Sequence, residues 1–200
     1  MTTGYDSLTF LARSQSWHEL LSSKPGVLIA SPPCTWYSAL QNINMHRYSA
    51  DVREARSRDA DLLLGYALQC CREQLRCGRG FVLERPWTAS SWKLPAVIDF
   101  MRLDGVRMVD FDQCATGLRG PNGQPIKKRT RLMTNIPQIV QVFSNFQCTC
   151  TVDHLKIEGA CLGVRLGQYC QVYTPLFCDQ LLACAASYIH DIDLEDSECF

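Results

Sequence analysis

Two short apolar runs and one long amphipathic segment dominate the pattern of hydrophobic and polar positions. Residues 27–30 (Val-Leu-Ile-Ala) and 81–83 (Phe-Val-Leu) have the length of buried strands, and a proline follows each run within three residues. Between them, residues 51–77 repeat apolar positions at helical spacing and lead into a Gly-Arg-Gly stop. This order of strand, helix and strand predicts a βαβ unit with parallel strands and a right-handed crossover.

The rest of the pattern predicts shorter elements. Further helices are expected at residues 17–21, 94–102, 137–145 and 175–190, and a further strand at residues 106–111. Residues 115–125 are rich in Gly and Pro and are predicted to form a loop. We therefore expect one α/β domain over residues 1–190, with a mostly parallel sheet flanked by helices, followed by an acidic disordered tail over residues 191–200.

Composition narrows the class of protein without fixing an activity. The chain has 200 residues, 46% of them apolar, which is enough for a globular core. Its formal net charge is zero, but the acidic tail leaves a modest basic excess elsewhere, which permits a polyanionic partner without requiring one. No apolar run is long enough to span a membrane, and no secretory signal opens the chain. We expect an intracellular protein, nuclear or cytoplasmic.

Twelve cysteines are unusually many for this length. Several fall in predicted helices, unlike the loop framework of a small secreted domain, so we expect mostly reduced thiols, with a disulfide-bonded form as the alternative. Zinc-ligand residue types cluster within fourteen positions, at Cys148, Cys150, His154 and Cys161. Their spacing matches no established zinc motif, so scattered cysteines without metal are the alternative.

The segment Ser-Pro-Pro-Cys-Thr-Trp-Tyr-Ser, residues 31–38, follows directly after the first predicted strand. Its prolines stiffen the chain, and Cys34 falls at the carboxyl end of a strand, where α/β sheets bind ligands. We interpret Cys34 as a thiolate nucleophile on a rigid turn. The alternative is a small buried cysteine of no chemical role.

Glu84 follows the second predicted strand, so parallel pairing would bring it close to Cys34. A cysteine nucleophile beside a carboxyl acid suits attack on a polarised ring carbon. The alternative for Glu84 is a structural ion pair, for example with Arg85. The basic run at residues 127–131 is interpreted as a phosphate or base contact, and its alternative is a solvated surface.

In this order the motifs resemble those of the cytosine-C5 DNA methyltransferases. Residues 31–38 are similar to the family's Pro-Cys nucleophile motif, and residues 81–86 resemble its Glu-Asn-Val strand end. Residues 114–117 with 128–132 resemble its Gly…Gln-x-Arg-x-Arg block. Divergent methyltransferase-like domains of phage and retrotransposon-type polyproteins are similar over residues 84–87, 112–114 and 128–135, and such polyprotein domains often carry Cys and His near residues 148–161.

The resemblance covers residues 17–190 and implies an incomplete Rossmann-like, S-adenosylmethionine-dependent methyltransferase fold. The family opens with a strand and a Gly-rich turn that hold the cofactor, and nothing before residue 26 supplies both. We therefore expect a missing amino-terminal segment or a partner chain. The Asn that follows the family's catalytic Glu is Arg85 here.

The family chemistry assigns roles to individual residues of this chain. Cys34 would attack C6 of a flipped cytosine, while Glu84 would bond N3 and the exocyclic amine. Arg129 or Arg131 would position the base and favour the Cys34 thiolate. Contacts to the substrate are implied for Ser31, Pro33, Thr35, Ser38 and Lys128. Contacts to S-adenosylmethionine are implied for Asp6 and Pro32.

The sequence thus predicts a DNA (cytosine-5)-methyltransferase-like domain, either active or degenerate, with DNA as its partner. A first alternative is a non-catalytic module on the same scaffold that binds nucleic acid or protein. A second is a cysteine-dependent enzyme of another class, such as a hydrolase, which would draw its base from His18, His46, His154 or His190.

Overall fold

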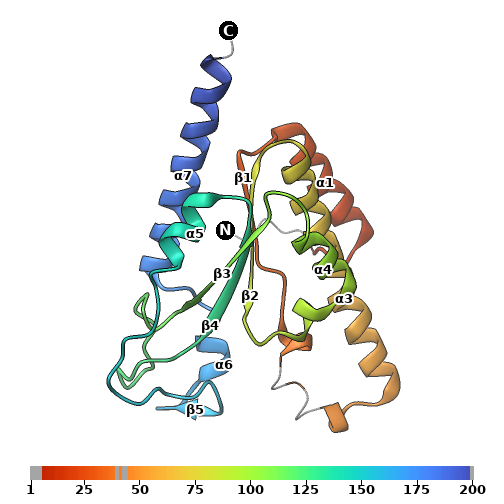
Figure 1. The fold of residues 1–200 in the computed structure, drawn as a ribbon. Coiled ribbons are helices and arrows are strands. Elements are labelled where there is room, and N and C mark those ends of the chain that lie inside the picture. The colour runs from red at the N-terminus through yellow and green to blue at the C-terminus, as the bar shows by residue number, and fades with distance from the viewer. Residues whose placement is uncertain (1–5, 39–40, 42–44, 199–200) are drawn as a thin grey trace. The chain divides into compact units, whose positions relative to one another are not determined.

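The computed structural model describes residues 6–38, 41 and 45–198, and it divides the chain into two compact units (Figure 1). Unit 1 spans Met1–Val106 and unit 2 spans Arg107–Phe200. Both contain helices and strands, so the α/β class predicted from the sequence is confirmed. No helix in the described part of the chain combines the length and the apolar composition needed for crossing a membrane.

Unit 1 is built on two parallel strands joined by a long helix. β1 (Val27–Ala30) pairs with β2 (Gly80–Pro86), from Val27 opposite Gly80 to Ala30 opposite Leu83. α3 (Ala50–Arg76) connects the strands and packs against both. The two strands, their parallel pairing and the connecting helix are therefore confirmed.

Shorter helices complete unit 1, and three of them pack against α3. α1 (Phe10–Ser23) starts earlier than the helix predicted at residues 17–21, because the Thr9 hydroxyl accepts the Ala12 N–H and caps the helix. α4 (Pro95–Met101) begins with a proline, which suits the first helical turn. The 3-10 helices of the unit are η1 (Thr35–Tyr37), η2 (Met45–Arg47) and η3 (Ser90–Lys93).

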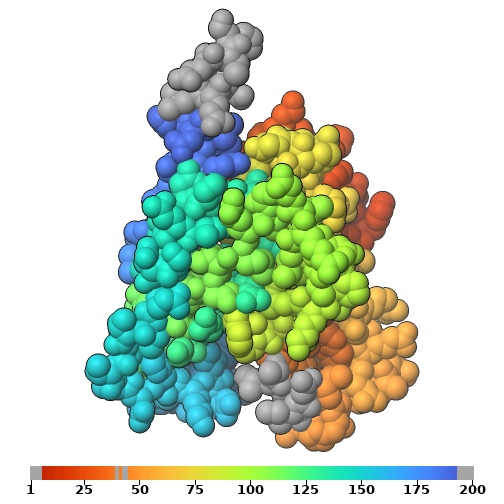
Figure 2. Space-filling model, viewed as in Figure 1, coloured from red at the N-terminus to blue at the C-terminus, as the bar shows by residue number. Residues whose placement is uncertain are grey.

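The core of unit 1 lies along β2, whose residues Phe81, Val82 and Leu83 have no exposed surface. Phe81 packs on Phe100 of α4, with ring centroids 5.4 Å apart. Figure 2 shows residues of η3 and α4 at the surface of unit 1 on one face. The apolar run at residues 81–83 is thus buried as expected. The run at residues 27–30 was also predicted to be buried, but it is only partly buried, and Ile29 is 43% exposed.

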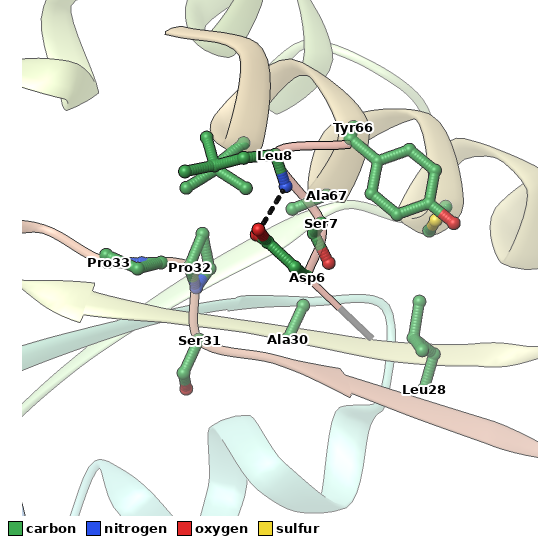
Figure 3. A pocket seen from close by; sticks show the side chains of 12 residues that line it. Asp6, Ser7, Leu8, Leu28, Ala30, Ser31, Pro32, Pro33, Tyr66 and Ala67 are labelled. Atoms are coloured by element: carbon green, nitrogen blue, oxygen red, sulfur yellow. Dashed lines mark hydrogen bonds between the residues drawn. The ribbon is translucent and has the colours of Figure 1, made fainter. Parts of the chain in front are cut away.

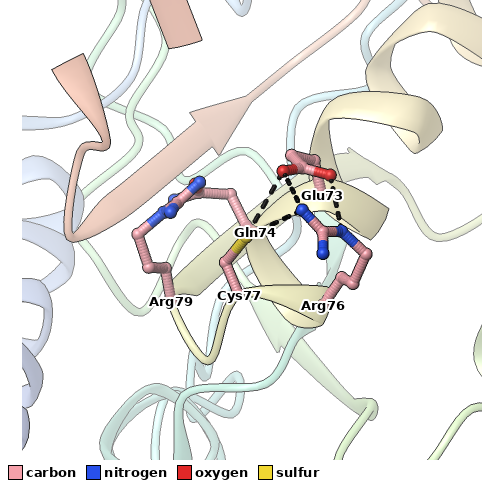
Figure 4. A network of polar contacts seen from close by, with 5 residues as sticks. All are labelled: Glu73, Gln74, Arg76, Cys77 and Arg79. Atoms are coloured by element: carbon pink, nitrogen blue, oxygen red, sulfur yellow. Dashed lines mark hydrogen bonds and ion pairs between the residues drawn. The ribbon is translucent and has the colours of Figure 1, made fainter. Parts of the chain in front are cut away.

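Gln74 of α3 joins the starts of both strands by hydrogen bonds. Its Nε2 donates to the carbonyls of Pro25 (2.9 Å) and Gly80 (3.0 Å), and its Oε1 accepts from Arg79 Nε (2.7 Å). The side chain is fully buried and lies in the polar network of Figure 4. Gln74 therefore satisfies backbone acceptors that burial would otherwise leave without a partner.

Unit 2 is built on two antiparallel strands. β3 (Arg107–Asp112) pairs with β4 (Arg129–Thr134), from Arg107 opposite Thr134 to Asp112 opposite Arg129. The expectation of a mostly parallel sheet is wrong for this unit. A loop without a crossover helix joins β3 to β4, and such a connection returns the chain in the opposite direction.

Helices and a small hairpin complete unit 2. They are α5 (Pro137–Phe143), β5 (Ala160–Cys161), β6 (Val164–Arg165), α6 (Leu166–Tyr169) and α7 (Pro175–Glu198). α7 includes most of the segment 191–200, which the sequence predicts to be a disordered tail. α5 packs against β3 and α7, and the rings of Phe111, Phe143 and Phe177 lie 5.0 to 5.5 Å apart in the core.

Replacing Gln74 should destabilise unit 1. Gln74→Leu keeps the volume but removes the donor for two backbone carbonyls, one of them buried and the other partly buried, so we expect the free energy of unfolding to fall by about 1–3 kcal/mol. Gln69→Leu is the matched control, because Gln69 is exposed on the same helix and should change stability by less than about 0.5 kcal/mol. Urea unfolding of the full chain measures both. Equal effects of the two substitutions would contradict the role given to Gln74.

Candidate functional site

The chain turns sharply after β1, and this turn carries Cys34. Pro32 and Pro33 follow the strand, and Cys34 precedes η1, where its carbonyl accepts the Tyr37 N–H at 3.0 Å. The backbone of Cys34 has φ −104° and ψ 1°, in the sparsely populated bridge region where many active-site residues are found. Cys34 is partly buried.

Glu84 lies on the neighbouring strand at the same end of the pair. It follows Leu83, which pairs with Ala30, so the carboxyl ends of β1 and β2 bring Glu84 and the turn to one edge. Glu84 is only 7% exposed. Parallel pairing thus brings the strand end that precedes the Cys34 turn and the strand end that carries Glu84 to the same edge of the pair.

Arg85 is a functional candidate that sequence reasoning treated only as a neighbour of Glu84. Its side chain is 1% exposed, its Nη2 donates to the Pro33 carbonyl at 3.5 Å, and its Cζ lies 4.8 Å from the centre of the Tyr37 ring. Among the described residues, Nε and Nη1 have no hydrogen-bond partner. Arg85 lies near the end of β2, beyond the apolar run at residues 81–83, so the hydrophobic pattern carries no signal of its burial.

The electrostatics of this edge are centred on the Arg85 guanidinium. Burial lowers the pKa of Arg85, while Cys34, Tyr37 and Glu84 partly offset that effect, because their negatively charged forms favour the cation. A buried cation beside a cysteine favours the thiolate, which is the nucleophilic form. The edge therefore combines a cysteine, a carboxyl group and a cation.

Tyr37 fixes η1 against α3. Its hydroxyl donates to Asp61 Oδ1 at 2.5 Å, and Ser90 Oγ donates to its carbonyl at 3.2 Å. Burial and the hydrogen bond to Asp61 raise the pKa of the Tyr37 hydroxyl well above its usual value, so this hydroxyl remains protonated at neutral pH. Tyr37 thus holds the end of η1, three residues after Cys34, in place.

A cavity of about 520 Å³ lies beside the turn, between β1, α3 and residues 6–8 (Figure 3). Leu28 and Ala30 line it from β1, two residues apart and therefore on one face of the strand. α3 contributes a helical stripe of Leu63, Tyr66, Ala67 and Cys70. The volume and the apolar lining are those of a small-molecule site.

The cavity brings together both residues for which the resemblance implied a cofactor contact. Asp6 and Pro32 both line it, and Figure 3 shows Asp6 between Pro32 and Tyr66. Asp6 is exposed, and its Oδ1 accepts the Leu8 N–H at 3.1 Å. Asp6 is the one charged side chain among the lining residues.

The remaining candidates of unit 1 divide between the cavity and the turn. Ser31 and Pro33 line the cavity, whereas Cys34 and Glu84 are not part of its lining. Thr35 is exposed at the start of η1, and its carbonyl accepts the Ser38 N–H at 3.3 Å. Cys34 therefore follows the cavity-lining residue Pro33 along the chain but is not part of the cavity lining.

The basic candidates all lie in unit 2. Arg131 forms a two-bonded ion pair with Asp110, directly opposite it in the β3–β4 register, at 2.5 and 2.8 Å. Lys128 Nζ donates to the Cys170 carbonyl at 2.9 Å, and Arg129 is exposed. Arg131 and Lys128 therefore make contacts within their own unit that stabilise it.

Unit 2 also contains a cluster of four metal-ligand side chains: Cys114, Cys148, Cys150 and His154. Their ligand atoms all lie within 4.8 Å of one another, and Cys148 Sγ is 3.3 Å from His154 Nε2. Burial raises the pKa of the Cys114 thiol, and a backbone hydrogen bond from Cys150 lowers that of Cys148. These residue types in this proximity are able to hold a metal ion.

The cluster differs from the set predicted from sequence spacing at one position. Cys161 lies in β5 and packs against an apolar cluster of unit 2. Its place is taken by Cys114, which follows β3. Sequence reasoning missed Cys114 because a separation of more than thirty residues carries no ligand-spacing signal, and only the fold closes it.

No protein-family model, curated protein or solved structure matches this chain, so its sites are interpreted from their own geometry and chemistry.

Proposed function

We propose that unit 1 binds S-adenosylmethionine and uses Cys34 in a DNA (cytosine-5)-methyltransferase-like reaction on a flipped cytosine. The observation that carries the proposal is the cavity beside the Cys34 turn, because both Asp6 and Pro32 line it. The motif resemblance supplies the reaction, and the cavity supplies a place for the cofactor at the carboxyl end of β1, where α/β sheets bind ligands.

The residues of the cavity suit an adenosyl group. Leu63 and Ala67 offer apolar contacts to a purine ring, and Asp6 offers a carboxylate oxygen to an amine or a ribose hydroxyl. Such a lining, largely apolar with few polar groups, is typical of small-molecule sites. S-adenosylmethionine, when bound, supplies the methyl group to C5 of the base and leaves as S-adenosylhomocysteine.

The chain's own residues carry the remaining chemistry. The Cys34 thiolate forms a bond from Sγ to C6 of cytosine, the ring electrons move towards C5, and Glu84 gives a proton to N3. After methylation, water takes the C5 proton and the Sγ–C6 bond breaks, which restores the thiolate. The N3 proton returns to Glu84, so the enzyme ends in its starting form.

Arg85 acts in this proposal as a positioning residue. Its guanidinium is buried beside the turn and is drawn electrostatically to both Cys34 and Glu84. A cation at this place favours the Cys34 thiolate before the substrate arrives. It replaces, within unit 1, the role that the resemblance implied for Arg129 or Arg131.

S-adenosylmethionine binding should depend on Asp6. We expect isothermal titration of the full chain to detect binding and Asp6→Asn to weaken it about tenfold, or about 1.4 kcal/mol, because a hydrogen bond to a charged acceptor is lost. Asp59→Asn is the matched control, since Asp59 is exposed on α3 outside the cavity lining. Absence of binding at millimolar cofactor, or equal affinity of the two variants, would refute the cofactor assignment.

Covalent trapping should depend on Cys34. DNA that contains 5-fluorocytosine retains the adduct, because the fluorine on C5 cannot leave as a proton does. We expect a denaturation-resistant complex that requires S-adenosylmethionine, is lost in Cys34→Ser and persists in Cys77→Ser, which changes an exposed cysteine of the same unit. DNA binding without any adduct would instead support the non-catalytic module. A Cys34 adduct formed without cofactor would support a cysteine enzyme of another class.

The reactivity of Cys34 should depend on Arg85. We expect Arg85→Met to slow alkylation of Cys34 by iodoacetamide at neutral pH about tenfold, because the buried cation that favours the thiolate is gone. Arg85→Lys should keep most of the rate. Peptide mapping by mass spectrometry measures Cys34, with Cys77 as the internal reference in the same sample. An unchanged rate in Arg85→Met would remove Arg85 from the proposal.

A further inference from the structure

We propose that Cys114, Cys148, Cys150 and His154 bind one structural zinc ion in unit 2. This site is independent of the methyl-transfer chemistry proposed for unit 1. The primary observation is that four soft or borderline ligand atoms, three sulfurs and one imidazole nitrogen, lie within 4.8 Å of one another. Three thiolates and one imidazole form one of the usual ligand sets of structural zinc.

The distances suit tetrahedral coordination. Zinc–sulfur bonds of about 2.3 Å place sulfur atoms of a tetrahedral site about 3.8 Å apart. A sulfur and a nitrogen of such a site lie about 3.6 Å apart, because the zinc–nitrogen bond is about 2.0–2.1 Å. Cys148 Sγ and His154 Nε2 are 3.3 Å apart, and all ligand atoms lie within 4.8 Å of one another, so small side-chain movements complete the site. Four protein ligands leave no open position for water or substrate, which distinguishes a structural site from a catalytic one.

The end of β3 positions the first two cysteines. Cys114 follows β3 closely, and Arg119 Nη1 donates to its carbonyl at 2.9 Å. The Cys148 N–H donates to Asp112 Oδ2 at 3.1 Å, and the Asp112 N–H donates to the Phe146 carbonyl at 2.9 Å. Contacts outside the cluster therefore hold Cys148 beside the strand that leads to Cys114.

A different loop positions His154. On either side of it, Gln124 Nε2 donates to the Asp153 carbonyl at 2.9 Å, and the Leu155 N–H donates to the Pro125 carbonyl at 2.8 Å. Leu155 also packs so closely on Gly120 that a Cβ there would lie 2.5 Å from its Cδ2. Contacts outside the cluster thus bring the segments around Cys114, Cys148 and His154 together, and the four ligand side chains lie where these segments meet.

Zinc would supply the cross-link that this part of unit 2 otherwise lacks. Residues 144–159 contain no helix or strand, and such long irregular segments inside a compact unit usually have a specific anchor. The ion would tie residues 148–154 to the end of β3. Because the ligands come together only in the folded chain, metal binding would add directly to the stability of the unit.

A disulfide is the competing use of the same sulfurs. It would join two of Cys114, Cys148 and Cys150 and would leave the third sulfur and His154 without a role. All three cysteines are free thiols in the structure. Zinc uses all four groups together, and we therefore favour it over a disulfide.

Zinc content of the purified full chain tests the proposal. We expect elemental analysis after purification under reducing conditions to find one zinc per chain, and Cys150→Ser and His154→Ala to reduce it to near zero. Both residues are partly buried, whereas Cys114 is buried, so these variants should destabilise the fold less than Cys114→Ser. Cys161→Ser is the matched control and should retain the ion, because Cys161 packs in the apolar cluster.

Cobalt provides a second readout that does not rely on the variants. Co²⁺ bound by three thiolates and one imidazole in a tetrahedron gives intense visible absorption, which Zn²⁺ should displace. Less than stoichiometric zinc with no cobalt spectrum, retention of zinc in His154→Ala, or a disulfide among these cysteines in the purified chain would overturn the proposal. Each result is separate from S-adenosylmethionine binding, so failure of one proposal leaves the other testable.

Discussion

The parallel register of β1 and β2 is the constraint on which unit 1 depends. Two strands that run in the same direction end at the same edge, and a long helix must return the chain between them. That geometry places the Pro-Pro-Cys turn beside Glu84 and Arg85 and makes α3 the second wall of the cavity. Every candidate residue of unit 1 owes its position to this pairing or to the cavity beside it.

A buried guanidinium sets the chemical character of that edge. Arg85 loses its hydration on burial, which costs free energy unless nearby groups compensate. The Pro33 carbonyl, the face of the Tyr37 ring and the electrostatic attraction of Cys34, Tyr37 and Glu84 provide part of that compensation. The arrangement that makes the buried cation tolerable is also the one on which the proposed role of Cys34 depends.

Different contacts stabilise unit 2. Antiparallel strands, an aromatic core around Phe111, and the Asp110–Arg131 ion pair organise its regular part. The irregular part, residues 144–159, has no such ladder of backbone hydrogen bonds and depends on side-chain contacts to the loops around it. The cluster of three cysteines and one histidine lies where these contacts converge.

The sequence by itself determined the two strands and the connecting helix of unit 1, because a long amphipathic helix and two fully apolar runs are strong signals. It also named Cys34 and Glu84 as candidate site residues and contained three of the four residues that gather as potential metal ligands. Only the tertiary structure decided the antiparallel direction of β4, the burial of Arg85 and the exchange of Cys161 for Cys114. The physical reason is that strand direction, desolvation and ligand proximity depend on contacts between distant segments, which leave no periodic trace along the chain.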